Sequence, residues 1–427
     1  MSKHVAVSLG SAALLEQQHI SEAVSFGNLY FDQIRKTEVS SFAYADTWLK
    51  SASSWYIDPD ISFFAGRQYP PSGKTIFGFI SDSCPDRWGR TLLQRSEVRK
   101  AALEQKTPRQ LTESDYLLGV NDTLRVGALR FSCEKDPEEN PIFLADGKEG
   151  SVPPWLRLRA LEHAAFSLES REATPEQLDA NLSLLLDPGS SLGGARPKAC
   201  VEDEKGNLWI AKFPSKHDNY DSGLTEYLVY ALAKDFEISV SEVAVDALSN
   251  RGHTFLIKRF DRDGSLRIHF SSAMNLLGKL DGDNAASDVS YLDILSLLRE
   301  HGATPIEDSL ELYKRILFSI AVSNTDDHLR NHGFLLSRSG WKLSPLYDVN
   351  PNPFGRGLSL NISEHDNSLS FELAIAQASF FGLSKNKARM LVDELTSLVP
   401  TWEKRAKKLG MDRATIDFIS PAFRCCI

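Results

Sequence analysis

The sequence of 427 residues predicts an α+β fold with three successive regions. Short β-like runs and turn signals fill the chain to about residue 132, strand-like runs dominate from about 195 to 260, and helical periodicity dominates after 285. A chain of this length usually needs more than one hydrophobic core, so we expect two or three domains or lobes. We place them at residues 1–150, 151–262 and 263–427.

The bulk composition narrows the class of protein. Hydrophobic residues make up 42% and charged residues 25%, which is typical of a soluble globular protein. A net charge of −9 argues against a broad surface that binds nucleic acid directly. The five cysteines form no CxxC pair, which favours free thiols and a reducing compartment. No apolar run approaches the roughly 20 residues of a membrane span, so we expect a cytoplasmic protein.

The first region should combine strands with one or two helices. Strand-like runs are HVAVSL at 4–9, TIFGFI at 75–80 and ALRFS at 128–132. The first of these is followed by Gly10; a strand explains it as well as a signal peptide does, and no clean cleavage site follows, which disfavours the signal peptide. The acidic stretch CEKDPEENP at 133–141 is predicted to be an exposed connection. Helical patterns follow at 155–170 and, with Pro175 in the first turn, at 175–186.

The middle and last regions follow a simple order of elements. Residues 195–215 predict a hairpin around the turn Lys205-Gly206-Asn207, and apolar spacing predicts a helix over 224–236. Two more strands are expected at 239–248 and 253–260. The remaining predicted helices cover 290–302, 306–323 and 387–409.

The stretch SNTDDHLRNHGFLL at 323–336 concentrates polar side chains between two apolar runs. His328 and His332 have the spacing of a zinc motif, but Leu329 stands where such a motif needs a glutamate, which disfavours a zinc site. Asp326 and Asn331 instead have the D-x4-N spacing of a kinase catalytic loop. That spacing alone is a weak signal, because both residue types are common in loops.

The signal gains weight from Asp348, which lies 17 residues beyond Asn331 in KLSPLYDVNP. The intervening FLLSRSGWKL predicts a hairpin that would return Asp348 to the neighbourhood of Asn331. One base for an attacking hydroxyl and two oxygen ligands for Mg²⁺ are what phosphoryl transfer requires. An Asx turn before Pro351 is the alternative interpretation of Asp348.

Other parts of a phosphotransferase can be matched along the chain. Lys212 lies in the strand-like run LWIAKFP, and Glu226 in the following helix could hold it or could be a solvated helix residue. The glycine-rich GSSLGGARPK at 189–198 could bind phosphates, and FLIKRFDR at 255–262 could form a hinge between lobes. By contrast, PSGKT at 71–75 has G-x6-GKT spacing and two prolines, which disfavours a Walker A loop.

Together these residues resemble the HipA family, bacterial serine/threonine kinases that act as toxins of toxin–antitoxin pairs. The resemblance is carried in order by GSSLGGARPK, LWIAKFP, TEYLVYALAKDF, KRFDR, TDDHLRNHGFLL and LSPLYDVNP, and more loosely by YPPSGKTIFGFISDSCPDRWGR near the N-terminus. It implies a two-lobed kinase-like HipA fold with an N-terminal α/β subdomain and a mostly helical C-terminal lobe.

The resemblance also implies roles for single residues. Asp326 would be the general base, Asn331 and Asp348 would bind Mg²⁺, and Ser191 would be the autophosphorylated residue, with Ser190 as the alternative. A phosphate there would repel the phosphates of ATP. The residues expected to contact ATP are Gly193, Gly194, Ala195, Arg196, Pro197, Lys198, Lys212, Lys258, Arg259, Phe260, His328, Asn331, Tyr347 and Asp348.

Family analogy extends to partners and substrate. It suggests a HipB-like helix-turn-helix antitoxin, contact with DNA only through that antitoxin, and a translation factor such as an aminoacyl-tRNA synthetase as substrate. The segment RIHFSSAMNLLG at 267–278 lacks the acidic residues expected from relatives, Lys258 replaces a glutamate of some relatives, and Asp327 has no assigned role. A lipid or small-molecule kinase and a non-catalytic binding scaffold on the kinase fold remain as alternatives.

Overall fold

The computed structural model describes residues 2–11, 23–50, 55–135, 141–144, 152–170, 174–190 and 194–423. Two sets of residues form compact units: unit 1 holds 1–216 and 258–271, and unit 2 holds 217–257 and 272–427. Within the described residues, none of the helices combines enough length and apolar character to cross a bilayer. The predicted loop residues Ser191 and Gly193 lie outside the described part of the chain.

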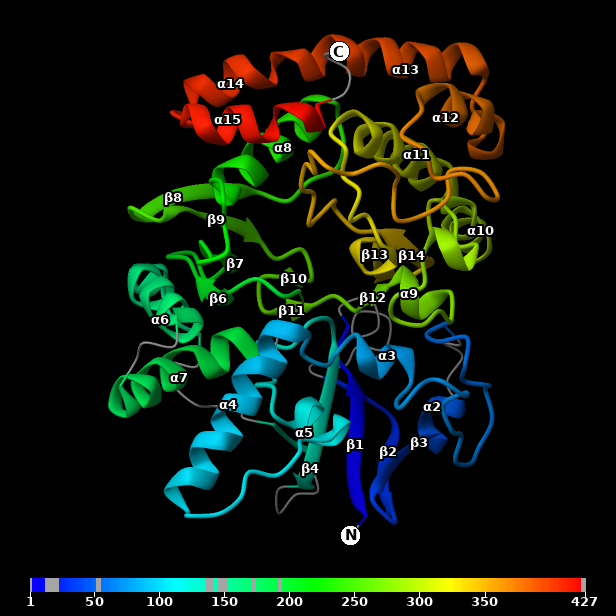
Figure 1. Ribbon diagram of the computed structural model, residues 1–427. Coiled ribbons are helices and arrows are strands. Elements are labelled where there is room, and N and C mark those ends of the chain that lie inside the picture. Colours follow the sequence, from blue (N-terminus) through cyan, green and yellow to red (C-terminus); the bar gives the residue numbers. More distant parts are fainter. Residues whose placement is uncertain are drawn as a thin grey trace. The chain divides into compact units, whose positions relative to one another are not determined.

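Unit 1 begins with a five-stranded antiparallel sheet in the order β3-β2-β1-β4-β5 (Figure 1). Its strands are β1 (Lys3–Leu9), β2 (Val24–Ile34), β3 (Thr37–Tyr44), β4 (Leu129–Lys135) and β5 (Pro141–Phe143). Alternate residues of β2 are buried, and its Phe26 packs against Phe42 and Phe79. β1 and β4 confirm the strands predicted at 4–9 and at 128–132.

One predicted strand of this unit is wrong. The run TIFGFI at 75–80 forms a loop that leads into the short helix α3 (Gly78–Ser81). Its aromatic residues are buried, as a strand would require, but the backbone of Phe79 donates to a side-chain oxygen of Asp58 at 3.0 Å instead of to a neighbouring strand. A buried side-chain acceptor thus takes the place of a sheet partner.

The other regular elements described in unit 1 are mainly helices and two small hairpins. Its helices are α2 (Asp46–Leu49), α4 (Arg87–Leu103), α5 (Glu113–Leu118), α6 (Leu158–Ser170) and α7 (Pro175–Ser190). The predicted hairpin appears as β6 (Lys198–Glu202) paired with β7 (Leu208–Lys212). A second hairpin joins β10 (Arg262–Asp263) to β11 (Leu266–Arg267), ahead of β12 (Phe270–Ser272).

Unit 2 is mostly helical and contains two hairpins that matter for the site. β8 (Val243–Ser249) pairs with β9 (Gly252–Lys258), and β13 (Gly333–Ser337) pairs with β14 (Gly340–Leu343). The second is the hairpin expected between Asn331 and Asp348. The helices are α8 (Ser222–Asp235), α9 (Ala273–Leu276), α10 (Tyr291–His301), α11 (Pro305–Ala321), α12 (Phe371–Gln377), α13 (Lys385–Leu398), α14 (Trp402–Lys408) and α15 (Arg413–Ile419).

The single helix predicted over 387–409 is divided in two. A 3₁₀ turn at Val399–Thr401 separates α13 from α14. Pro400 explains the break, because a proline inside a helix lacks an amide donor and its ring clashes with the preceding turn. The other long helices of unit 2 agree with the predicted ranges within a few residues.

Candidate active site

Two loops of unit 2 are bound together by four hydrogen bonds. The first loop, 323–331, follows α11, and the second, 347–352, follows β14. Backbone amides of the second loop donate to the first: Asn350 to the side chain of Asn324 at 3.3 Å, and Asn352 to the carbonyl of Ser323 at 3.0 Å. The Asn352 side chain donates to Thr325 at 2.8 Å, and the Tyr347 hydroxyl donates to the carbonyl of Arg330. These contacts bring Asp326 and Asp348 to one place.

The carboxylates of Asp326 and Asp348 influence each other. Asp326 is accessible to solvent, yet partial desolvation by the surrounding loops raises its pKa, and the negative charge of Asp348 raises it further. His328 acts in the opposite direction and lowers the pKa of Asp326. Two like charges held close together favour a bound cation, because a cation removes their repulsion.

The backbone of Asp348 adopts a conformation that few residues tolerate. Its φ of +57° lies in the left-handed region, where aspartate and asparagine are enriched. The strained turn is held by α8, since the Asp348 amide donates to the Tyr230 hydroxyl at 3.0 Å. Burial raises the pKa of Tyr230 well above its usual value, as do the charges of Glu226 and Asp348, so this hydroxyl keeps its proton. Such strain is often found at functional sites.

Asn331 is oriented for an oxygen-based role. Its side-chain nitrogen donates to the carbonyl of Asp326 at 2.8 Å. That bond uses the nitrogen end of the amide and leaves the oxygen as the atom that a metal would need. Carboxylate and amide oxygens are the ligands that Mg²⁺ prefers, so the set Asn331 and Asp348 fits the chemistry of that ion.

Asp327, which had no assigned role, is a buried anchor of the first loop. Its carboxylate accepts from the Tyr291 hydroxyl at 2.7 Å and from Ser319 at 3.3 Å, and it lies 3.0 Å from the ring of His332. Burial by itself raises the pKa of Asp327, but His332 and Tyr291 outweigh that effect and hold it below its usual range. Asp327 therefore ties the loop to α10 and α11 while its neighbour Asp326 stays accessible.

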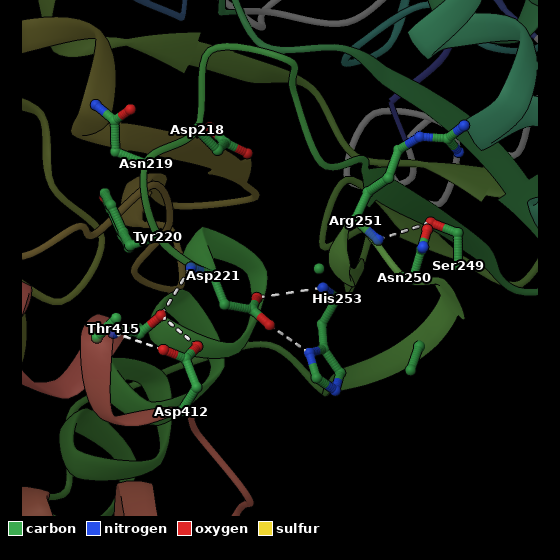
Figure 2. A pocket seen from close by; sticks show the side chains of 13 residues that line it. Asp218, Asn219, Tyr220, Asp221, Ser249, Asn250, Arg251, His253, Asp412 and Thr415 are labelled. Carbon is green, nitrogen blue, oxygen red and sulfur yellow. Dashed lines mark hydrogen bonds and ion pairs between the residues drawn. The ribbon is translucent and has the colours of Figure 1, made fainter.

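A polar pocket of about 460 Å³ lies at the start of α8, and hydrogen bonds among its lining residues hold that helix in place (Figure 2). Asp221 caps α8 by accepting from the amide of Leu224. Its carboxylate also accepts from the backbone amide of His253, and it lies 2.5 Å from the ring of the same histidine. The Asp221 amide in turn donates to Thr415 at 3.2 Å. These contacts join α8 to β9 and α15, and α8 carries the tyrosine that holds Asp348.

In unit 1, the β6–β7 hairpin directs two lysines to one face. Lys198 stands directly opposite Lys212 in the strand register. Side chains of directly opposed residues lie on the same side of a strand pair, and like charges in that arrangement destabilise it. Lys198 also approaches Gly194 so closely that an added Cβ on Gly194 would stand 2.5 Å from its Nζ. Gly194 has φ of +84°, so its backbone geometry favours glycine, whereas the flexible end of Lys198 could move aside for a larger residue.

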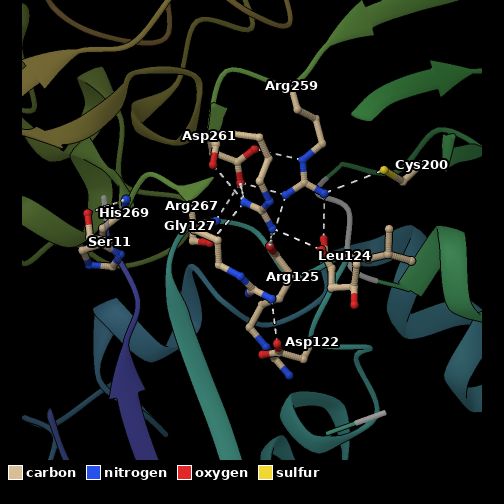
Figure 3. Close-up of polar contacts among 12 residues, drawn as sticks. Ser11, Asp122, Leu124, Arg125, Gly127, Cys200, Arg259, Asp261, Arg267 and His269 are labelled. Atoms are coloured by element: carbon tan, nitrogen blue, oxygen red, sulfur yellow. Dashed lines mark hydrogen bonds and ion pairs between the residues drawn. The ribbon is translucent and has the colours of Figure 1, made fainter. Parts of the chain in front are cut away.

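The predicted hinge is held by a buried network of charges (Figure 3). Arg259 donates to Asp261 and to the carbonyls of Leu124 and Arg125, and Arg262 also reaches Asp261 at 2.8 Å. Burial by itself raises the pKa of Asp261, but the two arginines hold it well below its usual range. The Arg259 side chain thus serves the interior of unit 1, and any contact of residue 259 with a nucleotide falls to its backbone.

The predicted site residues divide between the units. Unit 2 brings together Asp326, His328, Asn331, Tyr347 and Asp348. Unit 1 brings together Gly194, Lys198 and Lys212. Two other predicted residues make contacts of their own: Arg196 donates to the carbonyl of Phe213 at 2.9 Å, and the ring of Phe260 packs near that of Phe270. A pairing of Lys212 with Glu226 involves residues of different units and stays a prediction.

Sequence reasoning missed Tyr230, Asn324 and Asn352. Each acts through a contact with residues distant in the sequence, such as the 118 positions between Tyr230 and Asp348. The polar residues after Asp348, in DVNPN, were a signal for a tightly bonded loop. Nothing in the helix pattern around Tyr230 distinguishes its hydroxyl from that of any other buried tyrosine.

Residues 190–402 match the family model described as the HipA-like C-terminal domain. The chain therefore contains a HipA-like C-terminal domain. Its fold resembles that of HipA in a solved complex of HipA, HipB and operator DNA from Shewanella oneidensis, with a TM-score of 0.62 and 17% identity over 99% of this chain and 96% of that one. The predicted HipA-like α+β fold is confirmed.

Two curated relatives of this HipA-like chain carry the name "Putative kinase". One, from Haemophilus influenzae, is 29% identical over 189 residues, which cover 39% of this chain and 54% of the relative. The other, from Sinorhizobium fredii, is 32% identical over 148 residues, which cover 33% of each chain. The chain thus spans about half or less of the length of the curated relatives it matches.

Proposed function

We propose that this protein is an ATP- and Mg²⁺-dependent serine/threonine protein kinase. The observation that supports it most is the pair of bonded loops in unit 2, in which Asp326 and Asp348 lie close enough for one charge to raise the pKa of the other. The oriented amide of Asn331 adds the third oxygen of a kinase catalytic set. The names of the curated relatives point to the same class of reaction.

In the proposed reaction, Asp326 acts as the base. Its carboxylate accepts the proton of an acceptor hydroxyl, the hydroxyl oxygen bonds to the γ-phosphorus of ATP, and the bond from that phosphorus to the bridging oxygen breaks to release ADP. Mg²⁺, when bound by Asn331 and Asp348, would neutralise phosphate charge. The raised pKa of Asp326 brings this base closer to neutral pH, where proton acceptance is most effective.

We assign the ATP contacts of unit 1 to its two lysines and its hinge. Lys212 and the segment 194–198 would bind the phosphates, since two ammonium groups on one face of a hairpin suit an anion. The backbone of 258–260 would face the adenine, and Phe260 would pack near it. His328 and Tyr347 of unit 2 would complete the set, with Tyr347 acting through its bond to Arg330.

The biological role follows by analogy with HipA. We propose that the protein is the toxin of a type II toxin–antitoxin pair, that it binds a HipB-like antitoxin, and that it reaches DNA only through that partner. The solved HipA in its HipB and DNA complex supports this proposal through fold alone. The proposed substrate is a translation factor such as an aminoacyl-tRNA synthetase. The proposed autophosphorylation site is Ser191. The free thiols of Cys84, Cys133 and Cys200 favour the cytoplasm as the location.

The direct test is transfer of labelled γ-phosphate. Purified protein with Mg²⁺ and radiolabelled ATP should label itself and a protein acceptor, and mass spectrometry should locate the first label on Ser191 or Ser190. Labelling of lipid vesicles in place of protein would support the lipid-kinase alternative. Protein that binds no ATP and labels nothing would support the scaffold alternative and remove the proposal.

A further inference from the structure

The glycine segment 194–198 is held by the start of helix α4, which belongs to the N-terminal part of unit 1. The Gly194 amide donates to a side-chain oxygen of Asp86 at 2.7 Å, and the Gly194 carbonyl accepts from the amide of Trp88 at 3.1 Å. Both backbone groups of this glycine are therefore bonded to two residues of one helix turn.

The same helix turn also holds the other end of the segment. The indole nitrogen of Trp88 donates to the carbonyl of Lys198 at 2.9 Å. Gly189 packs against this bond, because an added Cβ there would stand 3.1 Å from both the Trp88 Nε1 and the Lys198 oxygen. Lys198, whose ammonium approaches Gly194, thus has its backbone fixed by Trp88.

Helix physics explains why α4 can do this. The first amides of a helix have no partner within the helix, so they must bond to something else. Asp86 caps α4 by accepting from the Arg87 amide at 2.8 Å with one oxygen, while its other oxygen accepts from Gly194. The next free amide, that of Trp88, goes to the Gly194 carbonyl. The glycine segment is in effect part of the cap of α4.

We infer that Asp86 and Trp88 are positioning residues for phosphate binding by segment 194–198. They touch no substrate, and they act by holding Gly194 and Lys198 in the conformation that receives the phosphates of ATP. This inference rests on the proposed function, because it takes the segment as a phosphate site. It gives the N-terminal part of the chain an indirect part in nucleotide binding, through the conformation of segment 194–198.

The test compares two ligands in titration calorimetry: a non-hydrolysable ATP analogue with Mg²⁺, and adenosine. Asp86→Ala should weaken binding of the analogue about tenfold, because it removes the two bonds by which the carboxylate holds the Gly194 and Arg87 amides. Adenosine binding should be unchanged. Asp86→Asn keeps one accepting oxygen where Asp86 uses two, for Gly194 and for Arg87, so it should recover only part of the affinity lost in Asp86→Ala.

Two further variants separate positioning from general stability. Trp88→Phe keeps an aromatic ring but loses the donor to Lys198 together with the pyrrole part of the buried indole, and should weaken analogue binding about threefold to tenfold. Thr112→Ala removes the cap of the neighbouring helix α5, which has no bond to segment 194–198, and should lower the melting temperature without changing analogue affinity.

Each outcome decides the matter. If wild-type protein binds the analogue and Asp86→Ala or Trp88→Phe binds it as well as Thr112→Ala does, the inference is wrong while the proposed function stands. If wild-type protein binds no analogue, the proposed function fails and the inference fails with it. Equal weakening of analogue and adenosine would also overturn the inference, because it would indicate a general loss of structure.

Discussion

Asp261 in unit 1 and Asp326 in unit 2 are carboxylates with opposite surroundings. Asp261 is buried and accepts from Arg259, Arg262 and the amide of Gly127, and these partners lower its pKa. Asp326 is accessible, and its pKa is raised by partial desolvation and by the nearby charge of Asp348. Asp261 thus lies beside two positive side chains, whereas Asp326 faces the negative charge of Asp348.

The difference separates structure from chemistry within one chain. A buried carboxylate surrounded by arginines stabilises the fold, and its removal leaves uncompensated buried charges. A carboxylate that shares its place with another one is destabilising until a cation or proton arrives, and such groups gather at functional sites. Removing one carboxylate at a time tests this contrast.

The largest expected effect is on activity and comes from Asp326→Asn. Phosphate transfer should fall by roughly 10²–10⁴-fold, the usual contribution of a positioned base. The melting temperature should change little, because desolvation and the repulsion from Asp348 oppose the attraction of this carboxylate to His328. Labelled-ATP assays measure the first quantity and calorimetry the second. Asp288→Asn, an exposed change in the same unit, is the control. Retained transfer by Asp326→Asn would remove the base from our assignment.

The next effect is on stability and comes from Asp261→Asn. Arg259 and Arg262 would lose their counter-charge inside unit 1, so the free energy of unfolding should fall by about 3–5 kcal/mol. Since the pKa of Asp261 is depressed in the folded state, its stabilisation is present above the ordinary carboxyl pKa and is lost as pH falls through the depressed value. The difference between wild type and variant should therefore shrink in acid.

Chemical denaturation across pH measures this, and Asp263→Asn provides the matched control. Asp263 lies two positions along the chain, is exposed, and belongs to the short strand β10. It should change stability by less than about 0.5 kcal/mol. A loss for Asp261→Asn no larger than that of Asp263→Asn would contradict the structural role of the network.

The fold was largely predictable because its elements are strongly patterned. The hairpin 333–343 and the spacing of Asp326, Asn331 and Asp348 follow from local signals, namely apolar runs around a turn and polar residues at loop positions. The errors have local causes too. The apolar spacing predicts one continuous helix over 387–409, but Pro400 divides it in two. The apolar run at 75–80 predicts a strand, but Asp58 accepts from its backbone in place of a neighbouring strand.

The supporting contacts were beyond reach of the sequence for a physical reason. Asp327 and Asp326 are identical neighbours in the chain, and only tertiary structure decides that one faces Tyr291 and His332 while the other faces Asp348. Likewise, Asp86 reads as an ordinary helix cap, and its bond to Gly194 spans 108 positions. Local propensity carries no information about such contacts.

Asp327→Asn sharpens the comparison within the catalytic loop itself. The amide keeps the shape but loses the charge that pairs with His332 and one acceptor for Tyr291, so stability should fall by about 1–3 kcal/mol. The pKa of Asp327 is lowered by folding, so this loss should be full at neutral pH and should diminish in acid. Urea denaturation at several pH values measures it. A variant as stable as wild type at pH 7 would show that the loop is held by its other bonds.

Asp348→Asn gives the smallest effect and the sharpest contrast, because it should stabilise the metal-free protein. It removes the charge that repels Asp326, and asparagine tolerates the positive φ at this position. Solvent screens the accessible pair, so the gain should be below about 1 kcal/mol, measured as a rise in melting temperature in EDTA. The repulsion exists only while both carboxylates are charged. Because the pKa of Asp326 is raised, Asp326 takes up a proton early as pH falls, and the gain in stability should disappear as pH falls through the carboxyl range. Added Mg²⁺ should stabilise wild type and leave the variant unchanged. A variant less stable than wild type in EDTA would mean that Asp348, like Asp261, is held by attraction, and the contrast between the two units would then fail.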